Sequence, residues 1–238
     1  MSSSPSPILP AAVLWDMDGT LVDTEAYWMA AETALVESFG GAWTHEQALG
    51  LVGQGLETSA TILQAAGVRM PTGEIVDHLT DRVARTLAEV GPPLRPGALE
   101  LLAALRAAGV RCALVTMSLR RMAAEVVAAV GVSLGDDPFE LIVSGDEATR
   151  PKPYPDAYLQ ACASLGVAPA DAVAIEDSPT GIRAAVAAGV TTIGVPLMVS
   201  LVGTGAHAIW PTLAERTPAD IAAVHAAHEP SRHAKGRP

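Results

Sequence analysis

Two aspartates, Asp16 and Asp18, stand at the end of a short apolar run in the sequence VLWDMDGT. Carboxylates this close together repel each other and resist burial, so a buried strand that ends in two of them is unfavourable as structure alone. We therefore interpret both aspartates as catalytic residues.

Further polar residues fall at the ends of other expected strands. Thr116 follows a strand expected over 110–115, and Glu176 and Asp177 follow one expected over 172–175. Ligands of an open parallel sheet bind outside the carboxyl ends of its strands, so these groups should converge with the two aspartates on one crevice. Ordinary loop polarity is the alternative, and it explains a lone threonine more easily than four carboxylates together.

Four carboxylates in one crevice repel each other unless a cation lies among them. The candidate ligands are Asp16, Asp18, Glu176 and Asp177. Oxygen ligands with no His or Cys nearby favour a hard ion, and Mg²⁺ is the natural choice. Mg²⁺ beside a nucleophilic carboxylate indicates phosphoryl chemistry, because the metal neutralises charge on the transferred group.

Lys152 is a candidate cation for the same crevice. It lies in RPKPYPD, a loop stiffened by three prolines, and all but two of the fifteen Lys and Arg residues of the chain are arginine. A lysine retained in such a chain indicates a site that needs a compact ammonium charge and not a guanidinium fork. Chance is the alternative explanation.

The expected elements can bring these residues together. Strands expected at 11–16, 110–115, 141–144, 172–175 and 191–195 alternate with helices, which predicts an α/β fold with a doubly wound parallel sheet. An edge strand over 206–209 and helical pieces to about 226 follow. The expected helices run from Pro96 to Ala108, over 119–130 before Gly131, over 155–165, and from a Ser178 cap through Pro179 to Gly189.

The segment between the first two strands has helical periodicity only. Its expected helices run from Asp23 or Thr24 to Ser38 and then over 44–50, 56–66 and 72–90. The predicted organisation is a discontinuous core over 11–22 and 93–226 with an inserted helical module over 23–92. Residues 1–10 and 227–238 are expected to be disordered, and His225, His228 and His233 are interpreted as a solvated tail in preference to a metal-binding one.

Composition restricts the partners. The formal net charge is −11, which argues against nucleic acid because a basic patch is needed to displace counterions from phosphates. The two cysteines, Cys112 and Cys162, predict neither a disulfide framework nor a metal cluster. Neither a targeting signal nor an apolar run long enough for a membrane span is evident, so we expect a cytoplasmic protein without membrane association, and a monomer.

At this point the residues resemble the haloacid dehalogenase superfamily of phosphatases and mutases, in its beta-phosphoglucomutase-like branch, over nearly the whole chain. DMDGT, residues 16–20, is similar to the first signature motif of that family, and Thr116 is similar to the second. Lys152 in KPYPD is similar to the third motif, and Glu176 with Asp177 in IEDSPTGI is similar to the fourth. The inserted module resembles the small α-helical cap of the family.

The resemblance implies a Mg²⁺-dependent hydrolysis of a small phosphorylated metabolite, such as a sugar phosphate. Asp16 would accept the phosphoryl group as an aspartyl phosphate, and Asp18 would act first as general acid and then as general base. The metal would be held by Asp16, the main-chain carbonyl of Asp18, Asp177, and Glu176 directly or through water. The implied phosphate-binding residues are Lys152, Thr116, the amide of Met117, Gly19 and Thr20.

Three other activities are alternatives. Dehalogenases of the superfamily usually lack the second aspartate, so Asp18 disfavours dehalogenation. Sugar-phosphate mutases usually carry a His, a Lys and an Arg in the cap, whereas Trp28, Val52 and Leu56 stand at the corresponding positions here. An inactive metal-binding module would be expected to lack at least one of the key residues, and all of them are present.

The cap is expected to supply substrate specificity. The candidates are Tyr27, Trp28, Gly53 and Gln54, with a leaving group that has an apolar or ring face. The alternative is that the aromatic residues only pack the cap, and we favour this alternative for Trp43.

Overall fold

The structure is a computed structural model that describes residues 8–228. Its centre is a six-stranded sheet in the order β3-β2-β1-β4-β5-β6, with every neighbouring pair parallel. The carboxyl ends of all strands therefore share one edge, and the strand order reverses between β1 and β4, where open α/β sheets bind their ligands. The strands are β1 (Ala12–Trp15), β2 (Arg111–Val115), β3 (Leu141–Val143), β4 (Ala172–Glu176), β5 (Thr191–Gly194) and β6 (Ala208–Ile209).

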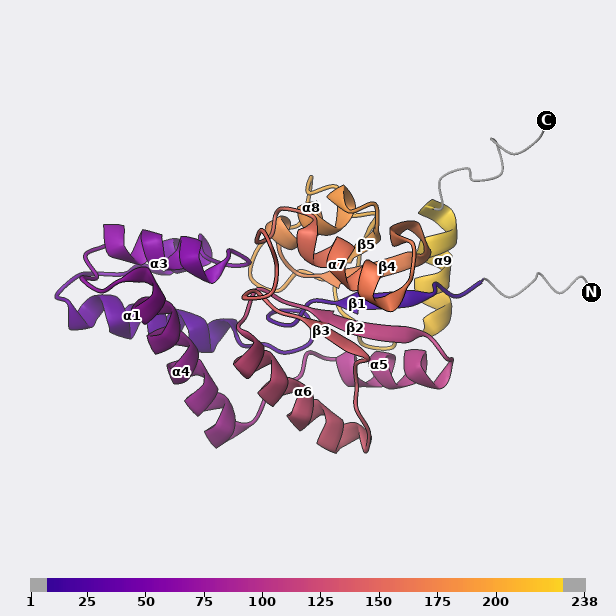
Figure 1. The fold of residues 1–238 in the computed structure, drawn as a ribbon, viewed down its shortest axis with the longest axis horizontal. Helices are drawn as coiled ribbons and strands as arrows, with labels where there is room; N and C mark the ends of the chain where they lie inside the picture. The colour runs from indigo at the N-terminus through magenta and orange to yellow at the C-terminus, as the bar shows by residue number, and fades with distance from the viewer. Residues whose placement is uncertain (1–7, 229–238) are drawn as a thin grey trace, which may run out of the picture.

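Helices cover both faces of this sheet, which confirms the predicted doubly wound α/β fold (Figure 1). Val13 and Trp15 of β1 face one layer, whereas Leu14 faces the other, and all three are fully buried. Burial on both faces explains why β1 is a continuous apolar run. One layer holds α5 (Ala98–Ala107), α6 (Arg120–Leu134) and α9 (Pro218–His228), and the other holds α7 (Asp156–Leu165) and α8 (Pro179–Ala187), with a short 3-10 helix, η1 (Pro169–Asp171), before β4.

Four further helices lie beyond one end of the sheet, between β1 and α5 in the chain (Figure 1). Where the chain leaves and re-enters the sheet region, the main-chain N–H of Asp23 donates to the Pro93 carbonyl at 2.7 Å, and that of Arg95 donates to Leu21 at 3.0 Å. We propose this paired crossing as the boundary between core and cap. The cap helices are α1 (Glu25–Ser38), α2 (His45–Leu49), α3 (Leu56–Ala65) and α4 (Thr72–Val90).

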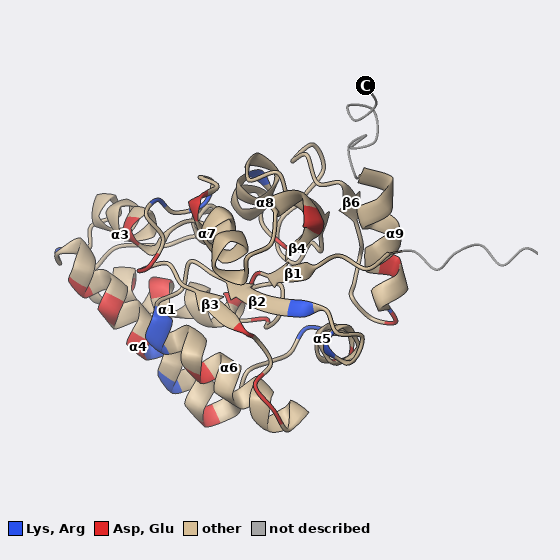
Figure 2. Cartoon of the chain, turned by 45° about the vertical axis from the view of Figure 1, so that its right-hand side comes forward, with Lys and Arg blue, Asp and Glu red and all other residues tan. Residues whose placement is uncertain are grey.

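The cap also contacts the core beyond this crossing, for example at the following two places. The Thr180 hydroxyl in α8 donates to the Gly53 carbonyl of the cap at 2.6 Å. Arg121 of α6 pairs with Asp77 and Asp81 of α4 at 2.9 Å and 3.1 Å, and Figure 2 shows these two helices side by side. The Arg121 pairs are exposed and contribute little stability, but both contacts hold the cap over the carboxyl edge of the sheet.

At two helix boundaries, a glycine explains why the structure differs from the prediction. Helix α6 does not end at Gly131 but continues to Leu134, where Gly135 adopts the left-handed conformation. Gly131 instead allows the chain at Asp136 to approach closely, since an added Cβ would lie 3.3 Å from its carbonyl oxygen. Helix α5 begins at Ala98 and not at Pro96, because Gly97 has a φ of +82° and cannot continue a helix.

The C-terminal histidines also differ from the prediction of a solvated tail. His225 is buried in α9, and its Nε2 lies 3.0 Å from the Ala170 carbonyl oxygen. His228 is the last residue of the same helix, two positions beyond the predicted limit of 226, and its ring packs edge-on against His207. His233 lies outside the described residues.

No helix within 8–228 is long and apolar enough to cross a bilayer.

Candidate active site

The turn after β1 is shaped by its own main chain. The Met17 carbonyl accepts hydrogen bonds from the amides of Thr20, Leu21 and Val22, and the Gly19 amide donates to Val22 at 2.7 Å. The Thr20 side chain is fully buried. The amides of Gly19 and Thr20 therefore have partners within the turn, whereas the Thr20 hydroxyl has none among the described residues; the predicted phosphate contact of these two residues stays a prediction.

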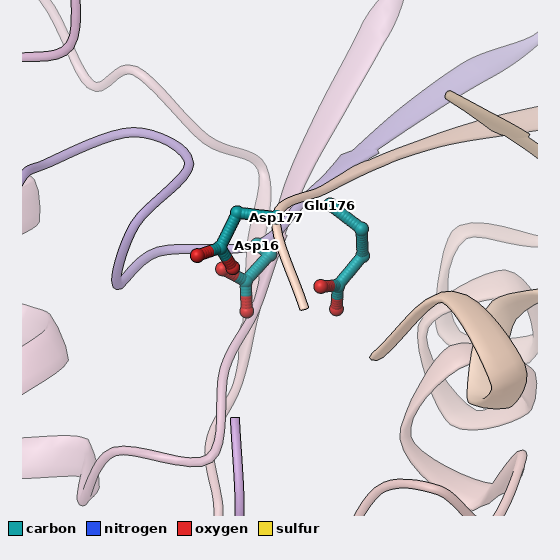
Figure 3. Close-up of side chains that lie close together, drawn as sticks. All are labelled: Asp16, Glu176 and Asp177. Carbon is teal, nitrogen blue, oxygen red and sulfur yellow. The ribbon is translucent and has the colours of Figure 1, made fainter. Parts of the chain in front are cut away.

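Two carboxyl oxygens at this edge are buried without a hydrogen-bond partner among the described residues. They are Oδ2 of Asp16 and Oδ2 of Asp177. Figure 3 shows the carboxyl groups of Asp16 and Asp177 close together, and one oxygen of Glu176 lies within 4.8 Å of an oxygen of each. Because buried unpaired oxygens are unfavourable, this arrangement fits a hard cation that binds both oxygens.

Gly19 makes room for this pair. Its φ is +84°, and an added Cβ would lie 2.0 Å from Oδ2 of Asp177. We expect Gly19→Ala to weaken Mg²⁺ binding at least about tenfold, because it displaces a ligand and also strains the backbone. Calorimetric titration with Mg²⁺ measures this directly.

Gly40→Ala is the matched control for that substitution. Gly40 has a similar φ of +78°, but nothing lies within 4 Å of its added Cβ. This variant carries the same backbone strain without the clash, so its Mg²⁺ affinity should equal that of the wild type. Equal losses in the two variants would mean that the Gly19 effect comes from strain alone.

Lys152 lies between two acids in the interior. Its Nζ donates to Oδ1 of Asp16 at 2.7 Å, to Oε1 of Glu176 at 2.6 Å and to the Val115 carbonyl at 3.0 Å. These bonds fix the ammonium group beside Oδ1 of Asp16 and leave Oδ2 of the same carboxyl group unpaired. The Val115 carbonyl at the end of β2 is the third hydrogen-bond acceptor of the ammonium group, so all three of its N–H donors have partners.

Glu176 is occupied by these and other neighbours. Its Oε1 also accepts from the Tyr158 hydroxyl at 2.7 Å, and its Oε2 accepts from the Ser178 hydroxyl at 3.1 Å. Gly181 allows this packing, since a Cβ there would lie 1.8 Å from the carboxylate. These bonds show that Glu176 positions Lys152, and its predicted metal contact, direct or through water, stays a prediction.

Burial dominates the electrostatics of this cluster. Burial, with a further contribution from Glu176, raises the pKa of Asp16 to about 7, although Lys152 opposes the rise. Burial and the Asp16 carboxylate raise the pKa of Asp177 well above its ordinary value. Burial alone would lower the pKa of Lys152, but Asp16 and Glu176 together raise it. An additional positive charge between the aspartates would favour their ionised forms.

Asp18 lies in a different environment from Asp16, among neutral donors. Its Oδ1 accepts from the Thr24 hydroxyl at 2.5 Å and from the Trp28 indole at 3.1 Å. Its Oδ2 accepts from the Ser118 hydroxyl at 2.7 Å and from Thr116 at the longer distance of 3.4 Å. These bonds hold the Asp18 carboxyl group at the pocket, and the predicted metal contact of its main-chain carbonyl stays a prediction.

Ser118 was missed by the sequence reasoning. Its position two residues after Thr116, just beyond β2, was the available signal. Its amide donates to the Thr116 hydroxyl at 3.0 Å, so the two side chains form one unit against Asp18. Met117, which lies between them in the sequence, also lines the pocket, and its sulfur accepts from the Lys152 amide at 3.2 Å. The predicted phosphate contact of the Met117 amide stays a prediction.

A pocket opens between this cluster and the cap. Trp28, Gly53 and Gln54 line it, as expected for specificity residues, but Tyr27 does not. Tyr27 is only half-buried and packs against the apolar core, because the next helical position carries Trp28 to the pocket face. Among the described residues that line the pocket, only Lys152 is basic. The other lining residues from the cap are Glu25, Met29, Glu32, Ala48, Leu51, Val52, Leu56, Ser59 and Leu79.

Glu25 and Glu32 were not anticipated as site residues. Both are buried in α1 and line the pocket. Burial raises the pKa of each to about 8, with Asp18 the next contributor for Glu25, while Trp43 opposes the rise for Glu32. A glutamate in an amphipathic helix is normally a solvated residue, so periodicity alone could not single them out.

These features describe an α/β core with two acidic residues directly after its first strand. The sequence profile described as haloacid dehalogenase-like hydrolase matches residues 13–195. The chain belongs to this family. Its fold and its beta-phosphoglucomutase-like branch agree with the expectation from the motifs.

Curated relatives match most of the chain, and they include a named phosphatase. The chain is 33% identical to Protein CbbY of Rhodobacter capsulatus over 78% of this chain and 85% of the relative. It is 32% identical to hexitol phosphatase B of Escherichia coli over 82% and 86% of the two chains. The structure of CbbY from Rhodobacter sphaeroides in complex with xylulose-(1,5)bisphosphate has a TM-score of 0.76 and 30% identity, and the match covers 87% of this chain and 96% of that one.

Proposed function

We propose that this chain is a Mg²⁺-dependent phosphomonoester hydrolase that forms an aspartyl phosphate on Asp16. That it is a phosphatase follows from its family and from the named phosphatase relatives. The observation that carries the proposed mechanism is the contrast between the two aspartates. Asp16 contacts Lys152 and has an unpaired Oδ2, whereas Asp18 is held by neutral donors that include Ser118.

In the first step, an oxygen of Asp16 attacks phosphorus and the ester bond breaks. The leaving oxygen takes a proton from Asp18, which Thr24 and Ser118 hold over the pocket. In the second step Asp18 removes a proton from water, and that water attacks the aspartyl phosphate to release inorganic phosphate and restore Asp16. Lys152 and Thr116 would bind the phosphoryl oxygens, since both line the pocket.

The residues present fit a bound Mg²⁺. Asp16 and Asp177 would hold it through their unpaired Oδ2 atoms, with the main-chain carbonyl of Asp18 as a further ligand. The ion would supply charge neutralisation for the phosphoryl oxygens.

Sugar-phosphate mutase activity is the second candidate, since the fold is shared with a mutase structure. The match to beta-phosphoglucomutase of Clostridium difficile has a TM-score of 0.80 at 20% identity, which shows the fold alone. A mutase must hold a second phosphate during turnover. Trp28, Val52 and Leu56 line the pocket where that branch usually carries cations, which supports hydrolysis.

Phosphate release distinguishes the two activities. Purified protein with Mg²⁺ should release inorganic phosphate from p-nitrophenyl phosphate and from a panel of sugar and polyol monophosphates. A mutase would instead interconvert hexose phosphate isomers with little net release of phosphate. Mg²⁺ binding without any turnover on the panel would favour the inactive module.

Mg²⁺ binding should strengthen as pH rises. The pKa of Asp16 is raised to about 7 in the metal-free fold. Between about pH 4 and about pH 7 the folded state therefore holds more protons than the unfolded state. Stability of the metal-free protein therefore falls as pH rises through this window, and Mg²⁺ must displace those protons to bind.

Thermal unfolding with and without Mg²⁺ measures this linkage. The increase in Tm caused by Mg²⁺ should be small near about pH 5 and should grow up to about pH 8. The Asp177→Asn variant, which lacks one of the two unpaired carboxylates, should show little Mg²⁺-dependent increase at any pH. An increase of equal size at all pH values in the wild type would contradict metal binding between these carboxylates.

A further inference from the structure

Helix α1 presents two buried acids to the leaving-group side of the pocket. Glu25 and Glu32 are each 6% exposed, and both line the pocket together with Trp28. They are two helical turns apart, so they lie on the same face of α1. The cap side of the pocket is therefore acidic, and none of its described lining residues is basic.

Glu32 is the more unusual of the two acids. Its Oε2 is buried and has no hydrogen bond of normal geometry among the described residues, although the Trp43 indole lies beside the Glu32 carboxyl group. An unpaired buried oxygen of this kind is unfavourable as part of the scaffold alone. A ligand that donates a hydrogen bond in the pocket would satisfy it.

We propose that Glu32, together with Glu25, binds hydrogen-bond donors on the leaving group, and that the substrate is the monophosphate of a polyhydroxylated or amino-bearing alcohol without a second anion. This inference rests on the proposed phosphatase function and adds the class of leaving group. A second phosphate or a carboxylate at this end would find no basic residue among the described cap residues that line the pocket, so the pocket selects against bisphosphates.

The Trp43 indole offers the competing explanation. It lies beside Glu32, and its Nε1 is also buried without a hydrogen-bond partner in the described chain. If Glu32 served only to accommodate this indole, substrate preference would not depend on its carboxyl group. The Trp43→Phe variant removes the N–H and so separates the two explanations.

The test compares kcat/KM for a hexitol phosphate with that for n-hexyl phosphate, a primary ester of equal chain length without hydroxyl groups. The wild type should prefer the hexitol phosphate at least about tenfold, and Glu32→Leu should reduce this ratio about tenfold. Glu37→Gln, on the exposed face of the same helix, and Trp43→Phe should leave the ratio unchanged. Circular dichroism confirms that each variant is folded.

An amino-sugar phosphate distinguishes hydroxyl donors from an ammonium group. A glutamine can still accept from a hydroxyl but cannot neutralise an ammonium, so Glu32→Gln should lose mainly the preference for the amino substrate if that is the true class. Equal kcat/KM for hexitol and hexyl phosphates in the wild type would overturn the inference, as would loss of the ratio in Trp43→Phe. Absence of Mg²⁺-dependent phosphate release from every ester would instead overturn the proposed function.

Discussion

Asp16→Asn should abolish phosphate release, with a loss of roughly ten-thousand-fold or more in kcat. The amide cannot form an acyl phosphate, so the loss should be the same for every phosphate ester. The fold should persist, because Lys152 retains Glu176 and the Val115 carbonyl as partners. A phosphate-release assay with a folded variant, checked by circular dichroism, measures this effect.

Two further variants show that the loss comes from the nucleophile. Asp177→Asn removes a metal ligand but leaves Asp16 in place, so its activity should recover partly at high Mg²⁺ concentration, whereas Asp16→Asn should stay inactive at every concentration. Asp137→Asn, an exposed residue, should behave as the wild type. Recovery of Asp16→Asn with Mg²⁺ would show that Asp16 acts only as a ligand.

Asp18→Asn should slow turnover by about 10²–10⁴-fold, and the loss should depend on the leaving group. Alkyl phosphates release a poor leaving group and need a proton, whereas p-nitrophenyl phosphate releases a stable phenolate. The first step of the reaction should therefore be slowed more for a hexitol phosphate than for the aryl ester. The oxygen of the new amide can accept from Thr24, and its NH₂ group can donate to the Ser118 hydroxyl, so the variant tests the proton and leaves the pocket's shape largely intact.

Pre-steady-state kinetics separate the two roles of Asp18. With the aryl ester, Asp18→Asn should give a burst of p-nitrophenol followed by slow release of phosphate, because the second step still lacks its base. Ser118→Ala removes one donor to Asp18 and should reduce the rate far less. Equal losses on alkyl and aryl esters, with no burst, would contradict the assignment of Asp18 as general acid and base.

The motif residues predicted the site well because each follows a strand of the same parallel sheet. The positions of Asp16, Thr116 and Asp177 follow from the rule that strand ends converge, which requires no side-chain detail. The sequence could not distinguish the roles of Glu176 and Asp177, because the two are adjacent at the carboxyl end of β4. The difference arises from Tyr158 and Ser178, which occupy the Glu176 oxygens and come from elements whose packing is tertiary.

The cap was harder to predict, because its specificity depends on which helix face meets the core. Tyr27 and Trp28 are adjacent in sequence, yet only Trp28 lines the pocket. Glu25 and Glu32 were overlooked because a glutamate is usually exposed, and their burial follows from how α1 packs over the sheet edge. Gly131 was misassigned as a helix end because close approach of the chain at Asp136 cannot be seen locally.

The central claim is that Asp16 carries the phosphoryl group during turnover. Quenching the protein with acid during turnover of p-nitrophenyl phosphate and reducing it with borohydride would convert a phosphorylated aspartate to homoserine, which peptide mass spectrometry can locate. The Asp18→Asn variant should increase the yield, since its intermediate decays slowly. We predict homoserine at position 16; phosphate release with an unmodified Asp16, or homoserine at another position, would contradict the mechanism.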